Sequence, residues 1–125
     1  MKLIDAINEV NNLKPNFYEL PEKIKWLSRV EQMIYDNIIC THEYNDGEEE
    51  IVFDGYEESD QDKTLIVHEP YDELYVHWLS AQIDWNNREF VGFNNSNAMF
   101  ESVYSAFRDA YNRSHMPKSR KKIYF

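Results

Sequence analysis

A scarcity of turn-forming residues is the feature that most constrains the fold of this chain, which has only three glycines and four prolines in 125 residues. A β-sandwich or β-barrel of this length needs a turn every few residues, and glycine and proline are the main residues that supply them. Hydrophobic residues make up 42% of the chain, which is enough for one packed core, and the length is typical of one domain. The sequence therefore predicts a single domain built mainly of helices.

Apolar residues recur at helical spacing in four segments, which predicts helices over residues 3–12, 21–42, 71–88 and 89–112. Pro15 ends the first pattern and Pro21 suits the start of the second. The pair Asn86-Asn87 interrupts the apolar pattern, so we expect a break between the third and fourth helices. The predicted core positions on these helices are Trp26, Leu27, Tyr35, Tyr71, Leu74, Trp78, Phe100, Tyr104 and Tyr111.

Between the second and third helices, the runs IVFDGY (51–56) and TLIVHEPY (64–71) are short and rich in Ile and Val. They flank the acidic stretch EESDQDK (57–63), so they predict a small β-hairpin with an acidic loop. An isolated hairpin is marginal in water, so we expect it to lie on the helices or to pair with another chain. The expected fold class is mainly α, a bundle of about four helices with this hairpin between helices 2 and 3.

Charge is distributed unevenly along the chain. The net charge is −10, and residues 43–73 alone carry thirteen acidic residues and one basic residue. Residues 113–125 carry five basic residues and no acidic one. The acidic middle should repel nucleic acid, whereas the basic segment could bind phosphate or an acidic protein surface. We expect one domain over residues 1–117, followed by a basic tail, 118–125, that is disordered on its own.

No catalytic or metal-binding motif emerges from the residue pattern. The four histidines do not share ligand spacing with another His or Cys, the loop THEYNDGEEE lacks the carboxylates that an EF-hand needs, and no glycine-rich phosphate loop occurs. Cys40 is the only cysteine, and its apolar neighbours favour a buried small residue over a nucleophile. We therefore expect no enzyme activity and no cofactor. We also expect no signal peptide and no membrane span, which needs roughly 18 consecutive apolar residues.

Three stretches together resemble the small head–tail connector (adaptor) proteins of prophages and long-tailed phages of Gram-positive bacteria. They are KIKWLSRVEQMIYDNII, FDGYEESD and PYDELYVHWLSAQIDWNNREFVGFNNSNAMFESVYSAFRDAYNRSHMP. Within them, the patterns W-L-x(6)-I-Y (26–35), Y-D-E-L-Y-x-x-W-L (71–79) and Y-N-R-S-H-M-P (111–117) carry the likeness, which covers roughly residues 1–117.

The resemblance implies a non-catalytic virion protein at the head–tail junction, made in the bacterial host cytoplasm. Copies of such connectors assemble into a ring, usually dodecameric, under the portal protein, and often stay monomeric until they dock. The ring extends the DNA channel without binding DNA specifically, and it supports the next head-completion or tail protein.

Within this framework the basic tail is predicted to dock on the portal through Lys118, Arg120, Lys121, Lys122, Ile123, Tyr124 and Phe125. Charge would steer the segment and the aromatic residues would anchor it. The acidic loop residues Glu57, Glu58, Asp60 and Asp62 are predicted to face the channel or an adjacent subunit. Two alternatives stay open: a small acidic protein that mimics DNA and blocks a host nucleic-acid enzyme, and a small metal or acid–base enzyme.

Overall fold

The computed structural model describes residues 1–118 of the chain, and this part is mainly helical, as the sequence predicts. Its helices are α1 (Leu3–Leu13), α2 (Leu20–Ile34), α3 (Leu74–Asn86) and α4 (Phe90–Ser114). A five-residue π-helical turn, Tyr35–Ile39, extends α2, and a single 3-10 turn, Glu58–Asp60, lies in the long connection to α3. No helix in this part of the chain is long and apolar enough to cross a membrane.

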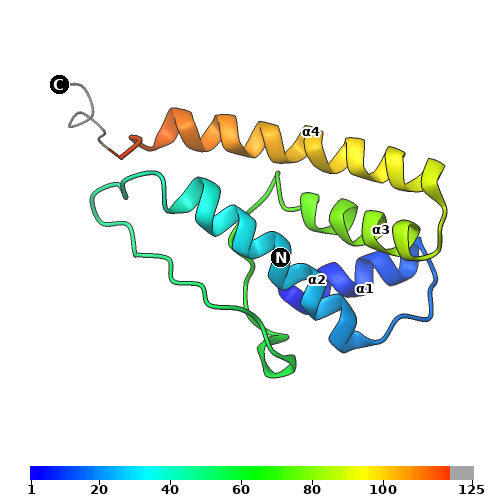
Figure 1. Cartoon of the computed structure of the whole chain (residues 1–125). Coiled ribbons are helices and arrows are strands. Elements are labelled where there is room, and N and C mark those ends of the chain that lie inside the picture. Colours follow the sequence, from blue (N-terminus) through cyan, green and yellow to red (C-terminus); the bar gives the residue numbers. More distant parts are fainter. Residues whose placement is uncertain (119–125) are drawn as a thin grey trace.

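Helix α3 forms the centre of the bundle. It contacts α4 on one side and α1 and α2 on the other (Figure 1). Its buried residues point in all directions, from Leu74, Tyr75 and Val76 through Leu79 to Ile83, which is typical of a helix enclosed by neighbours. The predicted break after α3 is present, because Asn87 caps the helix and Arg88 takes a positive φ of 61° before α4 begins.

The predicted β-hairpin is wrong: within residues 1–118 there are only two isolated β-bridges and no strand. Helix side chains accept hydrogen bonds from three amides of residues 51–56 and 64–69. The amide of Ile66 donates to Glu31 Oε2 over 2.8 Å, and that of Val67 donates to Tyr75 Oη over 2.9 Å. The amide of Tyr56 donates to Ser28 Oγ over 3.1 Å. The alternation of buried Leu65 and Val67 with exposed Thr64 and His68 therefore reflects packing on helices instead of strand pairing.

A buried carboxylate, Glu31, organises this packing. Its side chain is fully buried in α2, and it accepts hydrogen bonds from Tyr56 Oη (2.6 Å), Tyr75 Oη (2.5 Å) and the amide of Ile66. A buried charge is tolerated only when such donors replace water. Burial raises the pKa of Glu31 above its ordinary value, and the three hydrogen bonds oppose that shift.

A second buried carboxylate connects the helices at the other end of the bundle. Asp84 in α3 pairs with Lys14 Nζ (2.5 Å), at the end of α1, and accepts a hydrogen bond from Ser96 Oγ in α4 (3.1 Å). Gly92 allows α4 to approach this carboxylate, since a Cβ at that position would lie 3.0 Å from Asp84 Oδ2. The Asp84 contacts thus join three helices near the turn between α3 and α4.

Candidate functional site

The end of α4 is bound to the segment after α2 by a ladder of backbone contacts. The amide of Glu43 donates to the Met116 carbonyl over 2.7 Å, and the amide of Lys118 donates to the Thr41 carbonyl over 2.9 Å. His42 is buried beneath them, and its Nε2 lies 2.7 Å from Asn112 Oδ1. The start of the basic tail is therefore held against the bundle through Lys118. The other predicted tail residues, Arg120, Lys121, Lys122, Ile123, Tyr124 and Phe125, lie outside the described residues.

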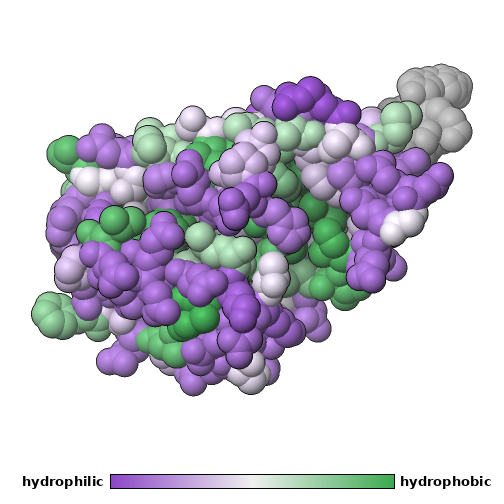
Figure 2. Space-filling view, turned by 180° about the vertical axis from the view of Figure 1, so that it is seen from behind, coloured by the Kyte–Doolittle hydropathy of each residue, from purple (hydrophilic) through white to green (hydrophobic). Residues whose placement is uncertain are grey.

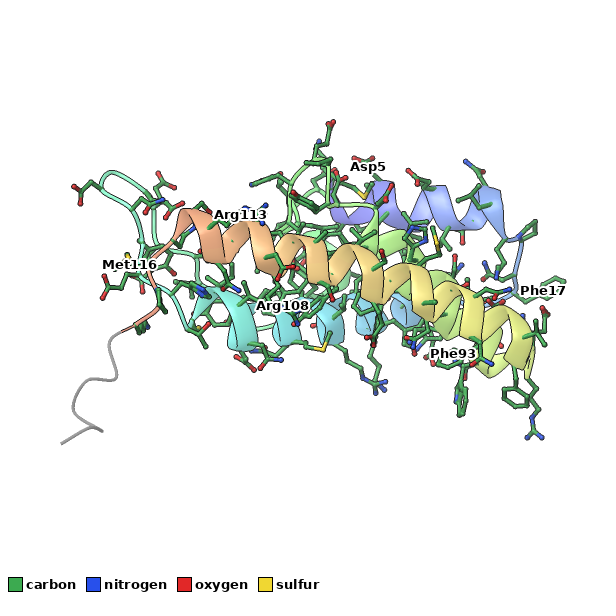
Figure 3. All side chains as sticks on the ribbon, turned by 90° about the horizontal axis from the view of Figure 1, so that it is seen from above. Asp5, Phe17, Phe93, Arg108, Arg113 and Met116 are labelled. Atoms are coloured by element: carbon green, nitrogen blue, oxygen red, sulfur yellow. The ribbon has the colours of Figure 1, made fainter. Side chains whose placement is uncertain are left out.

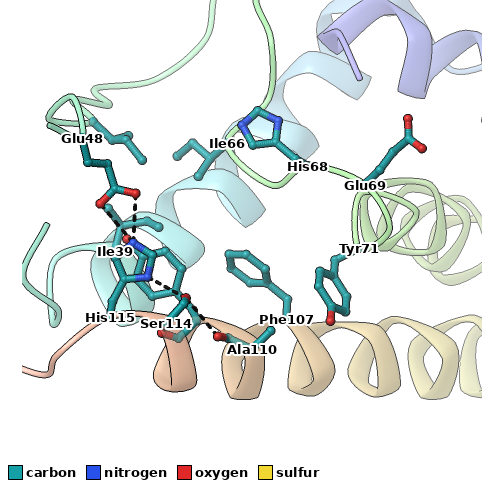
Figure 4. A pocket seen from close by; sticks show the side chains of 12 residues that line it. Ile39, Glu48, Ile66, His68, Glu69, Tyr71, Phe107, Ala110, Ser114 and His115 are labelled. Atoms are coloured by element: carbon teal, nitrogen blue, oxygen red, sulfur yellow. Dashed lines mark hydrogen bonds and ion pairs between the residues drawn. The ribbon is translucent and has the colours of Figure 1, made fainter. Parts of the chain in front are cut away.

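A pocket of about 410 Å³ opens beside this ladder, between the last turns of α4 and the coil segments that precede α3. Figure 4 shows Phe107 and Tyr71 lining it, with Ile39 and Ile66 around them. Glu48, Glu69, His68 and His115 stand at its margins (Figure 4). The pocket therefore joins an apolar interior to a polar rim, an arrangement that suits an apolar group attached to a charged segment.

The rim is ordered by a stack of aromatic and charged groups. The rings of Tyr111 and His115 are stacked with centroids 3.8 Å apart, and His115 Nε2 lies 3.0 Å from both Glu48 carboxylate oxygens. The hydrogen bond with His115 lowers the pKa of Glu48 below its usual range. Burial, with the nearby Glu48 carboxylate, raises the pKa of Tyr111 to about 12, so its hydroxyl stays neutral at physiological pH. These groups fix the pocket wall, where Ser114 Oγ also lies 2.8 Å from His115 Nδ1.

The opposite end of the molecule exposes aromatic side chains. Figure 3 shows Phe17 and Phe93 at the end away from Met116. Phe17 is fully exposed, and Trp85 and Phe90 are each about half exposed. Trp85 packs against Phe90 and Phe93 with ring centroids 5.5 and 5.1 Å away. We call Phe17, Trp85, Phe90 and Phe93 the aromatic end. Aromatic residues are enriched at protein–protein interfaces relative to the rest of protein surfaces.

The acidic loop stabilises the start of α1. Glu57, Glu58 and Asp62 are exposed, whereas Asp60 is half-buried. Asp60 accepts from the amide of Glu57 over 2.7 Å and pairs with Lys63 over 3.1 Å. These contacts lower the pKa of Asp60. The carbonyls of Lys63 and Gln61 accept hydrogen bonds from the first amides of α1, those of Leu3 and Ile4. The loop therefore caps α1, and its negative charge lies near the positive end of that helix dipole.

The nine predicted core positions divide into two groups by burial. Trp26, Leu27, Leu74 and Phe100 are buried. The others are half-buried and pack against the core, namely Tyr35, Tyr71, Trp78, Tyr104 and Tyr111. Among them, Tyr71 and Tyr111 also line the pocket. Cys40, expected to be buried, is only half-buried, because the π-helical turn places it at the end of the helix.

Sequence reasoning missed the pocket and the two buried carboxylates. Glu31 lies on the apolar stripe of α2, one residue after Val30 and three before Ile34, and a charge at such a position is the signal that could have identified it. The pocket had no comparable signal, because its walls come from four separate stretches of chain. Among residues 1–118, no group of three or more His, Cys, Asp or Glu side chains is placed to hold a metal ion.

Comparisons with protein-family models, with curated proteins and with solved structures found no match for this chain.

Proposed function

We propose that this chain is an assembly adaptor, a head–tail connector whose copies form a ring on a phage portal protein. The observation that carries the proposal is the two-ended form of the bundle. The basic segment starts at one end, where its first residue is bound to Thr41, and exposed aromatic side chains occupy the other end. A body with a different contact surface at each end suits a protein that joins two others.

The sequence resemblance names the class of partners. In this arrangement the end that carries the basic tail faces the portal, where Lys118, Arg120, Lys121 and Lys122 steer docking. The aromatic end faces away from the portal and receives the downstream head-completion or tail protein. The ring is dodecameric when docked, the free chain is monomeric, and DNA passes through the channel without specific contacts.

The acidic loop suits the channel wall or a subunit boundary in such a ring. Glu57, Glu58 and Asp62 are exposed on one connection, and a negative surface repels the phosphates of passing DNA. No reaction is assigned to the protein, and its place is the virion.

Negative-stain electron microscopy of the full chain mixed with the portal protein of the same phage or prophage tests the proposal. Extra ring density at the narrow end of the portal is expected. Bare portals at a large excess of this protein would overturn it and favour the DNA-mimic alternative, which inhibition assays on host nucleic-acid enzymes would then examine.

A second experiment tests the two ends of the molecule separately. Phe17→Ser should leave ring formation on the portal unchanged and weaken recruitment of the downstream protein, because Phe17 is fully exposed at the aromatic end. Val52→Ser is the matched control, since Val52 is 77% exposed and lies in the connection that carries the acidic loop. Equal effects of the two changes would argue against the aromatic end as a platform.

A further inference from the structure

The pocket beside the end of α4 has an interior suited to aromatic and branched apolar groups. Phe107 and Tyr71 lie with their ring centroids 6.0 Å apart, and Ile39, Ile51 and Ile66 complete the apolar lining. Figure 2 shows hydrophobic surface below α4, near the C-terminal end of the described chain and bordered by hydrophilic residues. The interior is therefore open to a ligand that approaches from outside the bundle.

The charge around this interior is negative. Glu48 and Glu69 belong to the lining and are exposed, and Glu49 and Glu50 follow Glu48 directly in the chain and are exposed as well. Among the described residues, the only basic side chains in the lining are His68 and His115, and His115 is already engaged by Glu48. The pocket thus favours a ligand that combines basic and apolar aromatic groups.

The chain itself contains one segment with this chemistry. Residues 118–125 read KSRKKIYF, with four basic residues followed directly by Ile, Tyr and Phe. The apolar residues match the interior, and the basic residues match the acidic rim.

The described chain leads away from the pocket before this segment begins. Ser114 and His115 line the pocket, but Pro117 and Lys118 line a different hollow, together with Cys40, Thr41 and His42. Hydrogen bonds of Met116 to Glu43 and of Lys118 to Thr41 fix that route. The described chain therefore leaves the pocket at His115 and lines the other hollow before the segment begins, and residues 118–125 contain no glycine or proline that would favour a turn back.

We propose that the pocket binds Ile123, Tyr124 and Phe125 of a second copy of this chain, with Lys121 and Lys122 facing Glu48 and Glu69. Such a contact is head-to-tail, because a pocket on one copy takes a segment of the next, and contacts of this type give rings when the rotation between copies closes. The inference rests on the proposed function and deepens it by naming a contact between copies. It moves Lys121, Lys122 and the apolar end of the tail from the portal to the neighbouring subunit, and leaves Lys118 and Arg120 to steer docking on the portal.

A labelled peptide of residues 118–125 tests the proposal by fluorescence anisotropy against the chain truncated after Lys118. We expect saturable binding that weakens as salt is added, because charges steer the encounter. We also expect binding to be lost when Tyr124 and Phe125 of the peptide are replaced by Ala. No saturable binding at millimolar protein would overturn the proposal.

Two protein variants locate the binding site. Ala110→Leu fills the pocket from α4 without removing a core side chain, since Ala110 lines the pocket and is half-buried, and it should weaken peptide binding at least about tenfold. Ala106→Leu is the matched control, because Ala106 is exposed one turn earlier on α4 and is not part of the lining. Equal peptide affinity of the two variants would place the peptide elsewhere and overturn the assignment.

A third comparison distinguishes a second copy from the chain's own tail. At micromolar concentration the full chain should bind the peptide within about twofold of the truncated chain, because its pocket is empty until copies meet. Peptide binding by the full chain that is about tenfold weaker would show that each tail fills its own pocket, and would overturn the contact between copies. Ring formation on the portal is measured separately, so failure of the peptide to bind leaves the connector function open to its own test.

Discussion

At the scale of single residues, the side chain that matters most for the fold is one that the hydrophobic pattern does not predict. Glu31 is a fully buried acid that holds two tyrosine hydroxyls and a coil amide. It therefore connects α2, α3 and the long connection between them. Glu31 contributes to the specificity of the fold as much as to its stability, because an apolar residue there could not accept the hydrogen bond that positions the amide of Ile66.

Replacing this acid with alanine should strongly destabilise the fold. Glu31→Ala leaves the Tyr75 hydroxyl and the Ile66 amide without their acceptor, at about 1–3 kcal/mol for each donor that stays buried. Glu31→Gln keeps an acceptor oxygen and should cost less. Urea denaturation measures both changes, and Gln32→Ala, at a partly exposed neighbour, is a control expected to stay within about 0.5 kcal/mol of the parent. Parent-like stability of Glu31→Ala would contradict the role given to this residue.

The same residue should make stability depend on pH. Because burial raises the pKa of Glu31 in the folded state above its ordinary 4.5, the folded protein binds this proton more tightly than the unfolded chain. The stabilisation from that proton is complete below the unfolded pKa and is lost as pH rises through the folded pKa. The free energy of unfolding of the parent, relative to that of Glu31→Gln, should therefore fall as pH rises above about 4.5. A difference that is constant with pH would show that the folded pKa is not raised.

At the scale of secondary-structure elements, the helices were predictable and the connection between α2 and α3 was not. The spacing of Leu3, Ile7 and Val10 specifies α1 because all three are fully or almost fully buried on one face. Asn86 and Asn87 end α3 where the apolar pattern stops. The Ile- and Val-rich segment 64–69 forms one isolated bridge, at Thr64, and then bends, and pattern alone does not reveal whether a strand or a set of helix side chains satisfies its amides.

Within α3, two tryptophans should respond very differently to truncation. The indole of Trp78 donates to the Trp26 carbonyl over 2.9 Å and packs on Phe100 with centroids 5.2 Å apart, so Trp78→Ala should cost about 3–5 kcal/mol. Trp85 is 53% exposed in the same helix, and Trp85→Ala should cost about 1 kcal/mol or less. Thermal unfolding checks both, and equal midpoints for the two variants would show that Trp78 does not support the core.

At the scale of the whole molecule, the core and the two ends are separate features. One continuous core joins residues from all four helices. The pocket borders this core, since Ile39 and Phe107 belong to both, whereas Phe17, Trp85 and Phe90 of the aromatic end are exposed. The basic tail was recognisable in sequence because charge composition is local. The pocket was not, because its walls meet only after the long connection has folded onto α4.

Removing residues 119–125 should therefore leave the fold intact. Truncation after Lys118 keeps the backbone hydrogen bond to Thr41, so the free energy of unfolding should stay within about 0.5 kcal/mol of the parent. Assembly on the portal should weaken, which titration of portal rings with each chain measures. Undiminished assembly by the truncated chain would show that the tail serves neither the portal nor a neighbouring copy.

The hydrogen bonds of Ile66 and Val67 to helix side chains should slow the exchange of these amide hydrogens with solvent. Both amides belong to a connection without regular structure, whose amides ordinarily exchange within seconds once exposed by local fluctuation. Here, however, their acceptors are Glu31 and Tyr75, on two different helices. Opening these amides requires the coil to detach from α2 and α3, so their deuterium uptake should be much slower than that of exposed coil amides. The exchange rate of this coil segment would thus report on its own docking onto two helices.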